Sequence, residues 1–197
     1  MERRNRRHER EITSAAQFSQ RRRFLRLGMT ALAAAWLPRH ALAAGTGGEP
    51  AERALAFYNT HTGERLQTNY WEQGQYIGEA LNQINHILRD HLANEVHAIE
   101  PKLLDLLHAI QNRLESREPF HVISGYRSAR TNAYLRAHTS GVADNSLHIY
   151  GQAIDIRLPG RDLRVIRKAA VDIRGGGVGF YPNSDFVHVD VGRVRYW

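Results

Sequence analysis

Residues 146–155 contain the stretch that decides the fold, and they read Ser146-Leu147-His148-Ile149-Tyr150-Gly151-Gln152-Ala153-Ile154-Asp155. Larger side chains alternate with small or charged ones over residues 150–158, which is typical of a β-strand. His148 stands just before this predicted strand and Asp155 lies within it, so a turn in the loop would bring imidazole and carboxylate together. Gly151 lets the backbone pass close to such a centre. The stretch therefore predicts a loop–strand unit that offers two metal ligands.

A second segment carries the same kind of chemistry, and it reads Asp185-Phe186-Val187-His188-Val189-Asp190. Because side chains alternate along a strand, His188 and Asp190 share one face. Together, His148, Asp155 and His188 supply two imidazoles and one carboxylate. Such a set of ligands binds zinc and leaves a fourth position open for water. The spacing alone leaves an alternative open, in which these are polar residues at strand ends with satisfied hydrogen bonds.

The rest of the sequence predicts helices first and antiparallel strands later. Residues 55–66 read as a hairpin whose turn contains Gly63. Apolar residues recur at helical spacing in 77–92 and in 101–114, where Pro101 opens the helix. Further helices are predicted at 128–137 and 163–173, and strands at 120–123, 178–181, 186–191 and 194–197. This order predicts an α+β fold, with a small antiparallel sheet that carries the zinc site and packs against N-terminal helices.

The composition of the 197-residue chain excludes several classes of protein. A content of 42% hydrophobic and 24% charged residues is that of an ordinary globular domain. No apolar run reaches the roughly 18–20 residues of a spanning helix, so a polytopic membrane protein is excluded. The chain has no cysteine, which excludes disulfides, thiolate zinc sites and a cysteine nucleophile.

The net charge of +7 comes entirely from the first 43 residues, which hold ten arginines and three glutamates. Residues 44–197 have seventeen basic and seventeen acidic side chains, so they carry no net charge. A DNA-binding function would rest only on this arginine-rich leader, and we therefore expect no nucleic-acid partner.

Residues 1–43 have the features of an export signal. Arginines at 21–23 precede an apolar run at 27–37, and Ala41-Leu42-Ala43 has the small-x-small pattern of a cleavage site. The paired arginines resemble a twin-arginine signal, which implies export of the folded protein by the twin-arginine translocase. We expect cleavage near Ala43, a flexible tail at 44–52, a domain at 53–197 and a periplasmic mature protein without a membrane span. The alternative for the leader is an amphipathic basic helix.

Three motifs together carry a resemblance to a known family. Ser-x-His-x-x-Gly-x-Ala-x-Asp at 146–155, Asp-x-x-His at 185–188 and Ser-Gly-Tyr-Arg-Ser at 124–128 resemble those of the LAS zinc peptidases, which have lysostaphin, D-Ala-D-Ala carboxypeptidase and hedgehog-like folds. Over roughly residues 54–197 the chain is similar to periplasmic murein endopeptidases of the carboxypeptidase family. The resemblance implies that His148, Asp155 and His188 bind Zn²⁺, and that Arg127 binds a substrate carboxylate or carbonyl.

Two carboxylates compete for the role of general base. The family pattern places an acidic residue three positions before the last zinc histidine, which favours Asp185. Asp190 is the alternative, because it shares a strand face with His188 and could lie close to the metal. It could instead orient the imidazole of His188. Weaker candidates for the cleft are Ser146, Gln152 and Tyr126, and the aromatic residues that could form either cleft walls or core are Trp71, Tyr126, Tyr181 and Trp197.

The expected function is zinc-dependent hydrolysis of an amide bond in the stem or cross-bridge peptides of peptidoglycan, for cell-wall remodelling. Loop shape decides which bond is cut, so D,D cross-bridges, L,D cross-bridges and a terminal D-Ala remain open. The competing class is a non-catalytic module on the same fold that binds peptidoglycan or activates a hydrolase. Retention of Asp185 and all three ligands argues against that class.

Overall fold

The computed structural model describes residues 51–139 and 141–197. The predicted signal at 1–43 and residues 44–50 of the predicted tail lie outside the described residues. Within the described ranges, no helix combines the length and the apolar character needed to cross a membrane.

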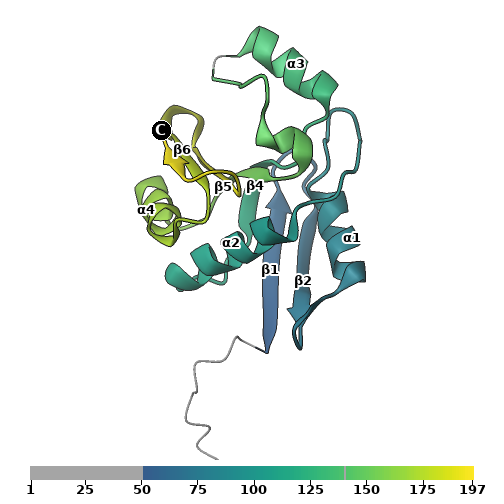
Figure 1. Ribbon diagram of the computed structural model, residues 1–197, viewed down its shortest axis with the longest axis vertical. Coiled ribbons are helices and arrows are strands. Elements are labelled where there is room, and N and C mark those ends of the chain that lie inside the picture. Colours follow the sequence, from purple (N-terminus) through teal and green to yellow (C-terminus); the bar gives the residue numbers. More distant parts are fainter. Residues whose placement is uncertain (1–50, 140) are drawn as a thin grey trace, which may run out of the picture. The chain divides into compact units, whose positions relative to one another are not determined.

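The described residues combine one eight-stranded sheet with four α-helices, which confirms the α+β prediction (Figure 1). The sheet order is β3-β2-β1-β4-β5-β7-β6-β8. The strands are β1 Glu52–Asn59, β2 Arg65–Glu72, β3 Gln75–Tyr76, β4 Phe120–Ser124, β5 Ala153–Arg157, β6 Gly177–Tyr181, β7 Phe186–Asp190 and β8 Arg195–Tyr196. The helices are α1 Gly78–Ile87, α2 Pro101–Arg113, α3 Ala129–His138 and α4 Leu163–Ile173, with short 3₁₀ turns η1 Leu147–Tyr150 and η2 Pro182–Ser184.

The sheet is larger than expected, and the prediction that it is antiparallel is wrong at two pairings. β1 runs parallel to β4, and β6 runs parallel to β8. A parallel pair needs a long crossover, and α1 and α2 supply it between the β1–β2 hairpin and β4. The central strands β4, β5, β7 and β6 are antiparallel to one another, as predicted.

Two predicted elements are shorter in the structure. The helix expected over 77–92 ends at Ile87, and Asp90 then pairs with Glu95 in an isolated bridge. The strand expected over 150–158 starts at Ala153, because residues 147–150 form η1. Gly151 ends η1 in the left-handed conformation, with φ of 65°. A Cβ at this position would run into the carbonyl of Ala98, so both the backbone angle and the space favour glycine.

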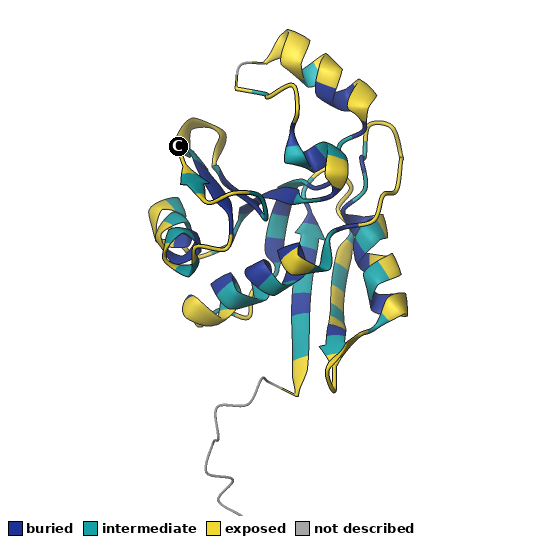
Figure 2. Cartoon of the chain, viewed as in Figure 1, coloured by how far each residue is buried: buried dark blue, intermediate teal, exposed yellow. Residues whose placement is uncertain are grey.

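Helices α1, α2 and α4 bury apolar faces and supply much of the core (Figure 2). α2 lies against β1 and α4, and α4 also contacts β6 and β7. The buried stripe of α2 includes Leu103, Leu107 and Ile110, each fully buried. Burial of each such side chain contributes about 1.5–3 kcal/mol relative to exposure. In α3, by contrast, the buried residues are the polar Thr131 and Asn132, which lie in its first turn.

Candidate active site

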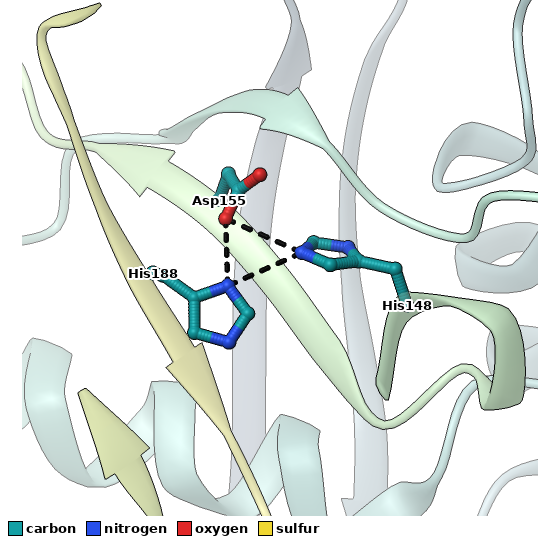
Figure 3. Close-up of side chains that lie close together, drawn as sticks. All are labelled: His148, Asp155 and His188. Atoms are coloured by element: carbon teal, nitrogen blue, oxygen red, sulfur yellow. Dashed lines mark hydrogen bonds and ion pairs between the residues drawn. The ribbon is translucent and has the colours of Figure 1, made fainter. Parts of the chain in front are cut away.

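The three side chains predicted as metal ligands converge in the structure (Figure 3). Oδ1 of Asp155 lies 2.8 Å from Nδ1 of His188 and 3.3 Å from Nε2 of His148. The two imidazole nitrogens are 3.2 Å apart. Zinc ligands at about 2.0–2.2 Å in tetrahedral geometry stand roughly 3.3 Å from one another, so these spacings suit a small cation.

The sheet places two of these groups by its register. Asp155 in β5 lies directly opposite His188 in the antiparallel neighbour β7. Side chains of opposed residues on one face are only about 4.5–5.5 Å apart at Cβ, which brings the carboxylate to the imidazole. His148 comes from η1, whose N-terminal cap is Ser146: its hydroxyl accepts a hydrogen bond from the backbone N–H of His148.

Hydrogen bonds at the outer ring nitrogens fix which nitrogen of each histidine faces the centre. Nδ1 of His148 donates to the carbonyl of Gly125 at 2.7 Å, and Nε2 of His188 donates to Asp190 at 3.1 Å. These partners assign the tautomers and leave a lone pair on the inner nitrogen of each ring. Two lone pairs and a carboxylate oxygen therefore face one another in a buried site, and this donor set fits a divalent cation such as zinc.

The electrostatic environment keeps the carboxylate of Asp155 ionised. Burial acts to raise the pKa of Asp155, but His148, His188 and Arg127 outweigh it and hold that pKa well below its usual range. Burial lowers the pKa of His148. For His188, burial is outweighed by hydrogen bonds with Asp155 and Asp190, which raise its pKa. An ionised carboxylate beside two imidazoles is the protonation state that binds a metal.

Asp190 lies on the far side of His188 from the three-ligand centre and is fully buried. Its Oδ2 faces Nε2 of His188, while Oδ1 accepts the backbone N–H groups of Gly177 and Gly192 at 3.0 and 2.8 Å. Burial acts to raise its pKa, but hydrogen bonds from His188, Arg195 and the two glycines hold it below the usual range. Of the two positions expected for Asp190, the structure shows the one that orients the imidazole.

Arg127 reaches the centre from the segment after β4. Its Nε donates to the hydroxyl of Ser124 at 2.7 Å, and its Nη2 pairs with Oδ2 of Asp155, the oxygen that does not face the histidines. Among the described residues, none accepts a hydrogen bond from its Nη1. The guanidinium therefore fixes the plane of the Asp155 carboxylate and still has donors for a substrate oxygen.

The structure does not place Asp185, which the family pattern favours as general base, at the three-ligand centre. Its carboxylate lies 2.5 Å from Arg157, is 60% exposed, and does not line the cavity around the centre. Asp185 adopts the left-handed conformation, with φ of 56°, at the corner between η2 and β7. This conformation, which aspartate tolerates better than most residues, ends the strand pattern and turns the side chain outward. Its neighbours Ser184 and Phe186 do line the cavity.

Some of the candidate cleft residues line the cavity and others do not. Ser146 and Tyr126 line the cavity. Ser146 also caps η1, and the hydroxyl of Tyr126 donates to Glu95 at 2.8 Å, so that burial and Glu95 raise its pKa to about 12. Gln152 is not among the residues that line the cavity, and its backbone is hydrogen-bonded to Leu147 and Val191. Trp71 lies in β2 against Arg53, also outside the cavity.

The cavity around the centre has a volume of about 580 Å³. One wall is aromatic: Tyr181 stacks on Phe186, and the indole N–H of Trp197 donates to the hydroxyl of Tyr181 at 2.8 Å. Sequence reasoning missed two further lining residues, His61 and His91, whose rings stack 4.0 Å apart. The hairpin turn at 59–64 and the turn after α1 carry no local signal that they meet.

The sequence profile described as "Peptidoglycan L,D-endopeptidase MepK", of the M15 peptidases, matches residues 48–197. The chain belongs to this family. The peptidoglycan L,D-endopeptidase MepK of Escherichia coli (strain K12) is 47% identical over 177 residues, which cover 90% of this chain and 96% of that protein. The probable peptidoglycan L,D-endopeptidase MepK of Haemophilus influenzae (strain Rd) is 42% identical over 178 residues, covering 90% and 95%.

Membership of the MepK family confirms that the chain is a peptidase. M15 peptidases are metallopeptidases, and His148, Asp155 and His188 form a group that could bind a metal. The resemblance to murein endopeptidases is thereby confirmed, while a carboxypeptidase activity remains a prediction. The alternative of a non-catalytic module is not favoured, because both relatives are named as enzymes and the match covers nearly their whole length.

Proposed function

We propose that this protein is a zinc-dependent endopeptidase that hydrolyses L,D amide bonds in the cross-bridges of peptidoglycan. One observation carries the proposal: three buried donor atoms converge with their lone pairs facing one another, in a chain 47% identical to a peptidoglycan L,D-endopeptidase. The L,D bond is favoured over the D,D bond and the terminal D-Ala because both relatives are named for it.

His148, Asp155 and His188 would hold the zinc ion, which when bound supplies Lewis acidity toward the scissile carbonyl and water. Arg127 already contacts Asp155, and its Nη1 would donate to the substrate carbonyl and stabilise negative charge on that oxygen. The aromatic wall of Tyr181, Phe186 and Trp197 would exclude water from one side of the peptide.

Asp185 is our proposed proton acceptor, although it is turned toward Arg157. It stands between two residues that line the cavity, and its ion pair with Arg157 is exposed. Exposed pairs contribute only about 0–1 kcal/mol, so a change of side-chain rotamer costs little. After such a change the carboxylate would take the proton of the attacking water and pass it to the leaving amine.

The proposed location is the periplasm, reached through the twin-arginine translocase with removal of residues 1–43. The arginine pair at 21–22 and the small residues at 41–43 support it. Peptidoglycan lies in that compartment, so the site of action and the export route agree.

Digestion of purified muropeptides tests the proposed function. The protein with Zn²⁺ should convert dimers linked through an L,D amide into monomers, detected by chromatography and mass spectrometry. Dimers linked through a D,D amide should remain intact. His148→Ala should be inactive, with Arg193→Gln, an exposed position away from the cavity, as the matched control. Binding of the dimers without cleavage by the zinc-loaded protein would instead identify a non-catalytic module.

A further inference from the structure

Strand β8 places the side chain of Arg195 in the cavity around the centre. No sequence motif singles out this residue. We infer that Arg195 is a positioning residue: it holds the carboxylate of Asp190, which in turn holds the imidazole of His188. The inference rests on the proposed role of His188 as a metal ligand, but it does not depend on the identity of the substrate.

The contact between Arg195 and Asp190 is bidentate. Nη1 of Arg195 lies 3.1 Å from Oδ1 of Asp190, and Nη2 lies 2.8 Å from Oδ2. Such a two-pronged contact fixes the plane of the carboxylate as well as its position. Because Oδ2 is also the partner of Nε2 of His188, fixing the plane aims that oxygen at the ring.

The buried position of Asp190 makes this partner necessary. Asp190 is fully buried, and its Oδ1 also accepts the backbone N–H groups of Gly177 and Gly192. A buried carboxylate is stable only when charge and hydrogen bonds compensate it, and Arg195 supplies the formal positive charge at this site. Lysine has no planar fork, so it can supply the charge without the orientation.

Arg195 lines the cavity, but its contacts argue against a primary role in binding substrate. Besides both oxygens of Asp190, it donates through Nη1 to the carbonyl of Arg193 at 3.1 Å. The ring of Trp197 lies 4.9 Å from the guanidinium carbon, and the same ring lies 5.3 Å from that of His188. The guanidinium therefore makes its hydrogen bonds to groups of the protein itself and lies against the ring of Trp197.

The test compares the Zn²⁺ affinity of two substitutions at Arg195 with a matched control. Competition with a chromophoric chelator would measure the Kd of Zn²⁺ for the purified protein. Arg195→Gln should weaken binding by about 10-fold or more, the lower end of the loss expected when the support of a ligand histidine is removed. Arg195→Lys should give an intermediate loss. Arg193→Gln makes the same change of charge two residues away and should leave the Kd unchanged.

The pair Asp190 and Arg195 should also be coupled. In an Asp190→Asn background, adding Arg195→Gln should change the Kd of Zn²⁺ by less than about twofold, because the arginine acts only through the carboxylate. This double variant leaves no unpaired buried charge, so it serves as the test even if Arg195→Gln alone fails to fold. If the loss of Zn²⁺ affinity in the double variant were the product of the losses in the two single variants, the inference would be overturned.

Kinetics separate positioning from substrate binding and from a general effect on folding. With Zn²⁺ saturating, Arg195→Gln should lower kcat and leave KM unchanged. A raised KM with unaltered Zn²⁺ affinity would assign Arg195 to the substrate, and a less stable metal-free protein with unaltered Zn²⁺ affinity would assign it to the fold; either result overturns the inference. If the wild type binds Zn²⁺ but cleaves no muropeptide, the proposed function fails while the pattern of Zn²⁺ affinities still stands.

Discussion

Asp185 and Asp190 stand on either side of His188 in the sequence and have opposite surroundings. Asp185 is exposed and paired with Arg157, whereas Asp190 is buried and bonded to the imidazole. We predict that Asp185→Asn keeps its bound zinc and its fold but loses about 10²–10⁴-fold in turnover, the usual contribution of a general base. Zinc content and cleavage of cross-linked muropeptides, measured on the same preparation, check this.

For Asp190→Asn we predict a different defect. An amide cannot accept from His188 and Arg195 as a carboxylate does, so the Kd of the metal should rise by about 10–100-fold. Zinc titration of the variant measures it. The two roles are reversed if Asp190→Asn retains its metal and is inactive while Asp185→Asn still cleaves.

At this scale the sequence predicted the ligand set, because the spacing of His148 and Asp155 and the alternation around His188 are local patterns. The local patterns did not predict the left-handed backbone of Asp185 or the position of Gln152 outside the cavity lining. Arg195 was missed because its contact with Asp190 depends on the pairing of β8 with β6, which no local pattern encodes.

Among the elements, α3 begins at a cap that is bonded to a buried carboxylate. Asp90 accepts the backbone N–H and hydroxyl of Ser128, the N-terminal cap of α3, at 2.9 and 2.8 Å. Its other oxygen accepts the backbone N–H groups of Leu92 and Ala93. Asp90→Asn should therefore lower the free energy of unfolding at pH 7 by about 1.5–3 kcal/mol, the range for a hydrogen bond to a charged group. Urea denaturation measures this loss.

The same contacts predict how this difference depends on pH. Burial acts to raise the pKa of Asp90, but hydrogen bonds from Thr131, Ser128 and Ala93 outweigh it, so the folded pKa lies below the ordinary 3.8. The stabilisation is present above that ordinary value and is lost as the pH falls through the folded pKa. The gap between wild type and Asp90→Asn should thus shrink below about pH 4. A gap that stays constant down to pH 2 would contradict this assignment.

Most elements were predictable, because the hairpin, the helices and the strands are local patterns of hydrophobic side chains. The stripe from Leu103 to Ile110 predicted α2, and the alternation around His188 predicted β7. The order of strands was not predictable in the same way. The parallel pairings of β1 with β4 and of β6 with β8 depend on how α1, α2 and α4 pack, which only the folded chain decides.

For the whole molecule, we predict that Zn²⁺ stabilises the fold, since its three ligands come from η1, β5 and β7. At a free concentration 100 times the Kd, the gain is about 2.7 kcal/mol, or roughly 5–10 °C in Tm for a chain of this length. A chelator should reverse the shift, as followed by thermal unfolding. His148→Ala should show no such shift, and a shift of equal size in that variant would place the ion elsewhere.

A second prediction at this scale concerns export, and it falls on residues outside the described part of the chain. Replacing Arg21 and Arg22 by lysine keeps the positive charge but removes the paired arginines of the signal. The precursor should then accumulate in the cytoplasm, as shown by fractionation and immunoblotting. Unchanged export in this variant would indicate the general secretion route instead.

The pairing of Asp155 with His188 across β5 and β7 makes the centre a check on assembly of the sheet. Side chains alternate between faces, so a slip of one residue between these strands would send one ligand to the opposite face. A chain folded with that error would keep its hydrogen-bonded ladder and most of its secondary structure, yet it could not hold an ion. In a preparation of this protein, the fraction of molecules that retain zinc would therefore count the molecules whose strands are correctly aligned.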